Sequence, residues 1–228
     1  MPEPLFDATA QAFADGIDRT IAAHRYLRGE LFVEAAERHV RRGGRILDFG
    51  CGPGRIARLV AERGFRVEGV DPSPAMIALA SAQPRGGAEV RFDVLETDGS
   101  ALPTGAYDGV VCSSVLEYVP DAAGLLGHFH RALVPRGALL LSFSNRRSLV
   151  RAWSSWRSRA RLPHLALTHH VLDAHALTTL LESSGFEVVT EPVFFEASPF
   201  DKRPPLRFLS ASSWVGVLGL VVARKVER

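Results

Sequence analysis

The segment from Arg45 to Gly54, which reads RILDFGCGPG, constrains the fold more than any other stretch of the chain. A short apolar run ends at Asp48, and glycines follow at positions 50, 52 and 54. A buried strand that turns through three glycines leaves backbone N–H groups facing an open pocket. Because apolar residues then recur at helical spacing, we expect a strand, a tight loop and a helix in succession.

Strand-like and helix-like segments alternate after this loop. We expect further strands, in chain order, over residues 66–70, 90–94, 107–113, 138–144, 186–195 and 214–223. We expect helices within residues 5–42 and, later, over 72–82, 124–133, 146–162 and 173–185. Near-continuous apolar strands alternating with helices indicate a mostly parallel α/β sheet covered on both faces. The link between the last two strands holds no convincing helix, so we expect these two to pair antiparallel.

Length and composition favour a single globular domain, since the chain has 228 residues and 46% of them are hydrophobic. The two cysteines, Cys51 and Cys112, offer no disulfide framework and indicate a reducing compartment. The N-terminus lacks the basic start and apolar stretch of a signal peptide, and no apolar run approaches the ~18 residues of a membrane span. We therefore expect a soluble, cytoplasmic protein.

The glycine-rich loop narrows the choice of ligand. Arg55 stands where a dinucleotide fingerprint has its third glycine, and no Lys-Ser/Thr pair follows as in a phosphate-cradling loop. The charge of Asp48 disfavours a pyrophosphate and favours a ligand with an ammonium or sulfonium group. A second acid, Asp71, ends the next strand, where a carboxylate can accept both hydroxyls of a ribose. The alternative for Asp71 is a surface acid that caps the following helix.

Five motifs in the right order carry a resemblance to a known family. They are ILDFGCGPG, VEGVDPS, DGSALP, YDGVVCSSVLEYV and RALVPRGALLLS. This series, from about Arg45 to Ser144, resembles class I S-adenosylmethionine-dependent methyltransferases, and LLESSGFEVV continues the resemblance weakly. The resemblance implies a Rossmann-like, seven-stranded sheet, with S-adenosylmethionine as the cofactor and S-adenosylhomocysteine as its product. It also implies a helical lid over residues 1–44, a cofactor-binding core over 45–145, a substrate-lid insert over 146–172 and the end of the core over 173–228.

The resemblance assigns roles to residues at the motif positions. The cofactor-binding set that it implies is Asp48, Gly50, Cys51 and Gly52 at the methionine end, Asp71 and Pro72 at the ribose, Met76, Asp98 and Gly99 at the adenine, Ser114 and Leu116 below the methyl group, and Tyr26 and Arg28 at the methionine carboxylate. Core packing is an equal alternative for Met76, and gap filling is one for Cys51. Tyr26 and Arg28 are alternatively half-exposed helix residues. Tyr118 stands where many relatives, including the quinone O-methyltransferases, carry histidine.

Methyl transfer to a hydroxyl gains from a general base within hydrogen-bond reach. The candidates are His169 and His170, with Glu117 and His175 as weaker ones, and each histidine is alternatively structural or solvent-facing. No carboxylate or thiol cluster accompanies the histidines, so we expect no metal.

The acceptor must be inferred from the insert, because residues 122–172 contain eight arginines and no acidic residue. In a helix over 146–161, Trp153 and Trp156 fall on an apolar side and arginines cover the other. This face fits an anionic membrane surface and a lipid-like acceptor, or a pocket for an acidic small molecule, or a packed helix with a solvated basic side. We expect no nucleic-acid partner. The sequence predicts a methyltransferase that acts on a small molecule, with a hydroxyl as the expected acceptor. The alternatives are N- or C-methylation and a non-catalytic protein that binds the cofactor.

Overall fold

A single mixed sheet organises the molecule. The structure, a computed structural model, describes residues 7, 10–12, 14–15, 27–83, 87–95, 98–158, 168–195 and 212–227. Within these residues, eight strands form the sheet in the order β3-β2-β1-β4-β5-β8-β6, with β7 also paired to β8. The strands are β1 (Arg45–Phe49), β2 (Arg66–Asp71), β3 (Val90–Val94), β4 (Tyr107–Cys112), β5 (Leu133–Ser144), β6 (Phe186–Val188), β7 (Val193–Phe195) and β8 (Leu218–Lys225).

The first five strands run parallel and the last one reverses, as the sequence predicts. β1 to β5 pair in parallel, whereas β8 pairs antiparallel with β5, β6 and β7. The helices are α2 (Leu27–His39), α3 (Arg55–Ala61), α4 (Pro74–Ala82), α5 (Ala122–Ala132), α6 (Leu149–Ser158) and α7 (Ala174–Ser183), with a short 3₁₀ turn, η2 (Leu116–Tyr118). The predicted Rossmann-like fold class is confirmed.

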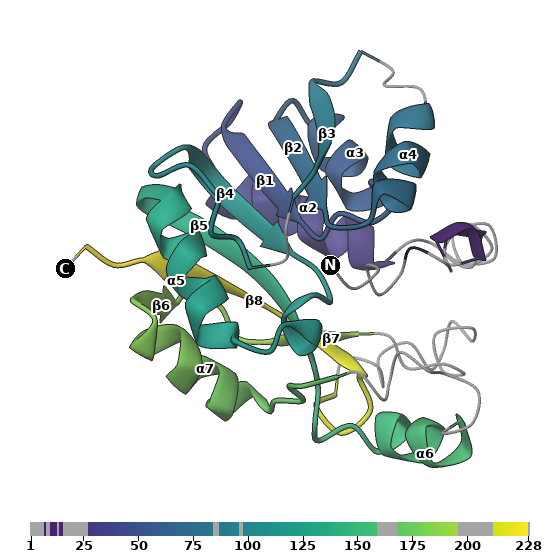
Figure 1. Cartoon of the computed structure of the whole chain (residues 1–228). Coiled ribbons are helices and arrows are strands. Elements are labelled where there is room, and N and C mark those ends of the chain that lie inside the picture. The colour runs from purple at the N-terminus through teal and green to yellow at the C-terminus, as the bar shows by residue number, and fades with distance from the viewer. Residues whose placement is uncertain are drawn as a thin grey trace.

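Two hydrophobic cores lie on the two faces of the sheet. One core joins the sheet to α2, α3 and α4, and the other joins it to α5 and α7 (Figure 1). Successive strand residues serve opposite cores, as Ile46 and Leu47 of β1 do. Because helices cover both faces of the sheet, the inner strands are apolar throughout. Only the ends of the strands are left uncovered.

The sequence predicts one strand over 186–195, but two short strands form there. The backbone N–H of Val189 donates to Val222 of β8, and Thr190 then accepts the N–H of Val222 with its side-chain oxygen. Pro192 follows and has no N–H to donate, so the regular ladder resumes only at β7. The sheet therefore has eight strands where seven were predicted. β8 also starts later than predicted, because Val215 and Gly216 turn back onto the carbonyl of Ser212.

The helix of the insert after β5 begins three residues later than predicted, because Arg146 and Arg147 form a turn and α6 starts at Leu149. α6 stands beyond the ends of the strands, apart from the two helical layers (Figure 1). The predicted continuation of this helix over 159–162, the side chain of Trp156, and Tyr26 of the predicted lid lie outside the described residues. No described helix combines the length and the apolar character that a membrane crossing requires.

Candidate active site

The ends of four parallel strands meet at one edge of the sheet. At the end of β1, Phe49 pairs with Val70 of β2 on one side and with Cys112 of β4 on the other. Cys112 in turn pairs with Leu141 of β5. The chain leaves β1 toward β2 on one side, while β4 lies on its other side, so this is a point where the strand order reverses. In open α/β sheets, ligands bind at such a point, outside the carboxyl ends of the strands.

The loop between β1 and α3 follows the glycine spacing. Gly50, Gly52 and Gly54 all have positive φ angles, of 71°, 52° and 75°. The backbone N–H groups of Gly50 and Cys51 both donate to the carbonyl of Val70, at 2.8 and 2.9 Å. A Cβ atom at Gly50 would lie 2.2 Å from a methyl carbon of Val115. Gly50 is therefore required both for its backbone conformation and for the close approach of the loop after β4.

Asp48 is a buried acid directly below this loop. It is 2% exposed, and its Oδ2 atom has no hydrogen-bond partner among the described residues. The pKa of Asp48 is raised to about 7, mainly by burial and also by the charge of Asp71, while a hydrogen bond from the backbone of Ala57 opposes the rise. A buried carboxylate with a free oxygen is stabilised by a cation. The site therefore fits the ammonium or sulfonium group of the predicted cofactor.

Asp71 connects the loop to the start of α4. Its Oδ2 accepts the N–H of Gly52 and its Oδ1 accepts the N–H of Ser73, both at 2.9 Å. Burial raises the pKa of Asp71, and these two hydrogen bonds oppose the rise. The cap of α4 is Ser73, whose hydroxyl accepts the N–H of Met76 at 3.1 Å. The alternative role of Asp71 as the helix cap is therefore taken by Ser73, and Asp71 faces the glycine loop.

The N-terminal segment reaches this part of the site through Asp7. Its Oδ1 accepts the hydroxyl of Ser73 at 2.5 Å and the N–H of Ala75 at 3.0 Å. These bonds lower the pKa of Asp7, with the bond from Ser73 as the largest cause. No sequence pattern indicates this contact, because Asp7 and Ser73 lie far apart in the chain.

The residues assigned to the adenine differ in exposure. Met76 is 2% exposed and packs in the interior at the start of α4. Asp98 is exposed, and its Oδ1 accepts both the N–H and the hydroxyl of Ser100 at 2.9 and 2.8 Å. These bonds hold the pKa of Asp98 below its usual value. Gly99 follows with a φ of 71°.

The loop after β4 approaches the methionine side of the site. Ser114 has a φ of 55°, and its N–H donates to the hydroxyl of Ser142 at 2.9 Å. Arg28 of α2 donates to the hydroxyl of Ser114 at 3.4 Å. Leu116 is buried in η2. Arg28 is thus a half-exposed residue of α2 whose side chain reaches Ser114.

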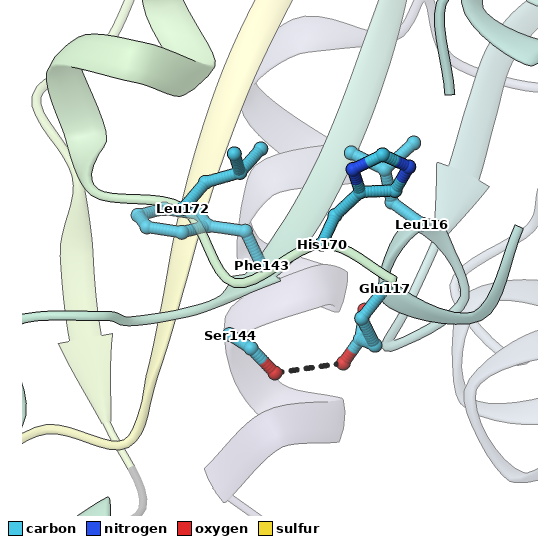
Figure 2. A pocket seen from close by; sticks show the side chains of 6 residues that line it. All are labelled: Leu116, Glu117, Phe143, Ser144, His170 and Leu172. Atoms are coloured by element: carbon cyan, nitrogen blue, oxygen red, sulfur yellow. Dashed lines mark hydrogen bonds between the residues drawn. The ribbon is translucent and has the colours of Figure 1, made fainter. Parts of the chain in front are cut away.

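A small pocket on the β5 side of the site contains Glu117. It is lined by Leu116, Glu117, Phe143, Ser144, His170 and Leu172 (Figure 2). Glu117 is 4% exposed, and the hydroxyl of Ser144 donates to its Oε1 at 3.0 Å. Burial raises the pKa of Glu117. Hydrogen bonds from its own backbone N–H and from Ser144 oppose the rise, as do the positive charges of Arg28 and Arg151.

The candidate histidines lie on the segment that crosses this pocket. The backbone N–H groups of His169 and His170 donate to the carbonyl of Glu117, at 2.7 and 3.3 Å. The side chain of His169 is exposed, whereas His170 lines the pocket with its Nε2 3.2 Å from the carbonyl oxygen of Pro120. His175 is exposed on α7. Among the described residues, no three His, Cys, Asp or Glu side chains gather closely enough to hold a metal ion.

The comparisons identify the family. A family model described as a methyltransferase domain matches residues 20–191. The chain belongs to this methyltransferase-domain family. A solved structure of an S-adenosylmethionine-dependent methyltransferase from Mesorhizobium loti is 25% identical, covers 85% of this chain and 95% of its own, and has a TM-score of 0.65. The predicted membership of the S-adenosylmethionine-dependent methyltransferases, and with it the predicted cofactor, is confirmed.

Other relatives agree on the fold or on part of the sequence. A methyltransferase from Thermotoga maritima shares the fold at 19% identity and a TM-score of 0.71, over 97% of this chain and 100% of its own. The ubiquinone biosynthesis O-methyltransferase of Pseudomonas aeruginosa is 36% identical over 107 residues, 46% of each chain. Its counterpart from Azotobacter vinelandii is 37% identical over 120 residues, 51% of each chain. The matches thus span about half the length of these curated relatives.

Ser144 and Arg151 were missed as site residues by sequence reasoning. Arg151 was placed only on the basic side of the insert, yet its Nη1 atom donates to the hydroxyl of Ser144 at 3.3 Å. Ser144 ends the fifth predicted strand, beside the end of the fourth, and this position was the available signal. Glu117 was ranked below the histidines because the sequence did not show its burial.

Proposed function

We propose that this protein transfers a methyl group from S-adenosylmethionine to a hydroxyl group of a small molecule. The observation that supports the donor most directly is the pair of buried acids, Asp48 and Asp71, on either side of the glycine loop. The unpartnered Oδ2 of Asp48 calls for a positive charge, and Asp71 lies at the end of β2, where a ribose binds in related folds.

The chain's own residues would act mainly by positioning. When bound, S-adenosylmethionine supplies a methyl group on a positively charged sulfur, which an acceptor can attack in line. The loop and Asp48 would hold the methionine end, Asp71 the ribose, and Arg28 the methionine carboxylate. Holding donor and acceptor in line and excluding water lowers the barrier without covalent help from the protein.

The adenine end would be held by residues after β2 and β3. Met76 would pack against the ring, Asp98 would accept its amino group, and Gly99 would donate a backbone N–H to it. Ser114 and Leu116 would lie below the transferred methyl group. Fixing the adenosine in this way directs the reactive methyl toward the ends of β4 and β5.

A hydroxyl acceptor is supported by two observations. The curated relatives are named O-methyltransferases, and an acid and a histidine, Glu117 and His170, line the pocket beside the donor site. Transfer to nitrogen or carbon, and binding of the cofactor without turnover, are the alternatives.

The test uses the purified chain with deuterated S-adenosylmethionine and three sets of compounds, namely phenols and alcohols, amines, and carbon acids. Mass spectrometry detects the labelled product, and calorimetry measures the binding of S-adenosylhomocysteine. We expect labelled ethers from the first set and tight binding of the product. Labelled products from amines or carbon acids alone would overturn the choice of hydroxyl. Binding without any labelled product would overturn the enzyme.

We also propose that the start of the insert contacts an anionic membrane surface, from which a lipid-like acceptor would enter. Leu149, Trp153 and Trp214 are 64%, 53% and 52% exposed, and Arg147 stacks over the ring of Trp214 at 4.6 Å. The N–H of Leu149 donates to the carbonyl of Trp214 at 2.9 Å, so the two segments lie together. Apolar rings beside arginines suit the boundary between lipid headgroups and acyl chains.

Vesicle sedimentation tests this contact. We expect the chain to sediment with phosphatidylglycerol vesicles at low salt, to be released as the salt concentration rises, and to remain in solution with phosphatidylcholine. Trp153→Ser with Trp214→Ser should abolish sedimentation. The matched control is Val94→Ser, because Val94 is 54% exposed on β3 at the other side of the sheet. Equal sedimentation of the double variant and the control would overturn the proposal.

A further inference from the structure

Glu117 is a buried acid whose carboxylate is only half satisfied. Its Oε1 accepts the hydroxyl of Ser144 at 3.0 Å, whereas its Oε2 has no hydrogen-bond partner among the described residues. Leaving a buried polar atom unpaired destabilises a fold, and it does so more strongly when the group is charged. Because this free carboxylate oxygen lies beside a pocket, it is available to accept a hydrogen bond from a bound ligand.

The positive charges around Glu117 favour its ionised form in spite of its burial. Arg28 approaches from α2 and Arg151 from α6, and both favour the charged form of Glu117. Burial nevertheless prevails and raises the pKa of Glu117 above its usual value. Burial raises the pKa values of Cys112 of β4 and Tyr118 of η2, and the charge of Glu117 raises both further.

Ser144 fixes the direction of the carboxylate. Figure 2 shows its hydroxyl pointing at Glu117 across the pocket, and Arg151 donates to the same hydroxyl at 3.3 Å. Ser144 therefore acts as a positioning residue that holds one carboxylate oxygen and leaves the other for a ligand.

Glu117 also lies close to the expected methyl group. It follows Ser114 and Leu116, the residues that would lie below the donor, on the same turn after β4. The pKa of Cys112 at the end of β4 is raised by burial and then by the charges of both Glu117 and Asp48, so the acceptor side and the donor side meet at this strand end. The histidines are placed less well, since His169 is exposed and the ring of His170 contacts the carbonyl of Pro120.

We propose that Glu117 is the general base of the reaction and takes the proton from the acceptor hydroxyl through Oε2. This inference rests on the proposed function. The O–H bond breaks as the O–CH₃ bond forms, and the S–CH₃ bond breaks with its electron pair left on sulfur. The positive charge of the donor and the negative charge of Glu117 are lost together. The products are a neutral ether, S-adenosylhomocysteine and a protonated Glu117, which then releases its proton to solvent.

The test compares Glu117→Gln with Glu187→Gln, a control on an exposed acid of β6. Glutamine keeps the size of the side chain and an oxygen for Ser144 but cannot take a proton. The assay uses catechol and nitrocatechol, because the nitro compound is already ionised at the assay pH. We expect Glu117→Gln to bind S-adenosylhomocysteine as the wild type does, and to lose about 100-fold in kcat/KM with catechol. With nitrocatechol we expect a loss below about tenfold, since the ionised oxygen of that acceptor attacks without giving up a proton.

The pH profile provides a second reading. The wild type should lose kcat/KM with catechol as the pH falls and Glu117 becomes protonated, and Glu117→Gln should lack this limb. Equal losses with the two acceptors would indicate a structural role and overturn the inference, as would an unchanged kcat/KM. If the wild type methylates neither catechol nor any other hydroxyl compound, the proposed function fails and the inference fails with it. A wild type that turns over while Glu117→Gln turns over equally well overturns the inference alone.

Discussion

Replacing Asp48 with asparagine tests the donor side of the site, because the change removes a buried charge and keeps the shape of the side chain. Asp48 is 2% exposed, and burial raises its pKa from 3.8 to about 7. At about 1.4 kcal/mol for each tenfold change in an ionisation constant, keeping Asp48 ionised costs the ligand-free fold about 4 kcal/mol. The new amide places a donor where the unpartnered oxygen stood, which costs about 1–3 kcal/mol.

The pH dependence separates these two effects. Between about pH 4 and pH 7 the folded chain keeps a proton on Asp48 that the unfolded chain has released. The free energy of unfolding of the wild type therefore falls as the pH rises through this window, and Asp48 causes no further loss above it. The cost of the amide does not depend on pH. Between pH 5 and pH 8 we expect the free energy of unfolding of Asp48→Asn to rise by about 3 kcal/mol relative to that of the wild type.

Urea denaturation of the ligand-free proteins at several pH values measures this difference. Asp93→Asn is the control, because it removes an exposed carboxylate from β3. Calorimetry at pH 8 should show that Asp48→Asn binds S-adenosylmethionine more weakly than the wild type, since the carboxylate no longer faces the positive charges of the ligand. Parallel stability curves for Asp48→Asn and wild type would refute the reasoning from burial. Undiminished binding would refute the role of Asp48 toward the donor.

Four further substitutions test the loop and the start of α4. Asp71→Asn should weaken the binding of S-adenosylhomocysteine in calorimetry by about tenfold or more, because it loses hydrogen bonds to a charged group worth about 1.5–3 kcal/mol; equal affinity would exclude Asp71 from the site. Gly50→Ala should fail to give folded protein by circular dichroism, because its Cβ would lie 2.2 Å from Val115. Gly52→Ala meets no atom within 4 Å and should cost only about 1–2 kcal/mol for the left-handed backbone, so equal losses would contradict the steric argument. Ser73→Ala should lower the free energy of unfolding by about 1 kcal/mol in urea, through loss of the helix cap, and an unchanged value would show that the cap is replaced.

The fold was predictable because each local signal agreed with its neighbours. Apolar runs of strand length alternate with helical patterns, and glycine or an acid marks each boundary, so the parallel sheet follows from short-range information. The break between β6 and β7 was not predictable, because it depends on Thr190 accepting an N–H from β8. A side chain that replaces a carbonyl in the ladder leaves no periodic signal in its own strand.

The donor side of the site is likewise predictable from the sequence, whereas the acceptor side is not. The donor side lies within β1, β2 and the loops that follow them, so Asp48 and Asp71 are found by reading along the chain. The acceptor side is assembled from four separate elements, since Glu117, Ser144, Arg28 and Arg151 come from η2, β5, α2 and α6. Nothing in the spacing of these four residues indicates that they meet, and only the fold shows that Glu117 is buried.

The two buried acids, Asp48 and Glu117, need different partners, and this difference links donor binding to the chemistry. Asp48 needs a positive charge from a ligand, whereas Glu117 has Arg28 and Arg151 nearby and needs a proton donor. Binding of S-adenosylmethionine would stabilise the ionised form of Asp48 and release a proton from it below about pH 7. The same positive charge would favour the ionised form of Glu117 across the end of β4. Arrival of the donor would thus prepare the base before the acceptor is attacked, so the carboxylate that accepts the proton is most available when the methyl group is in place.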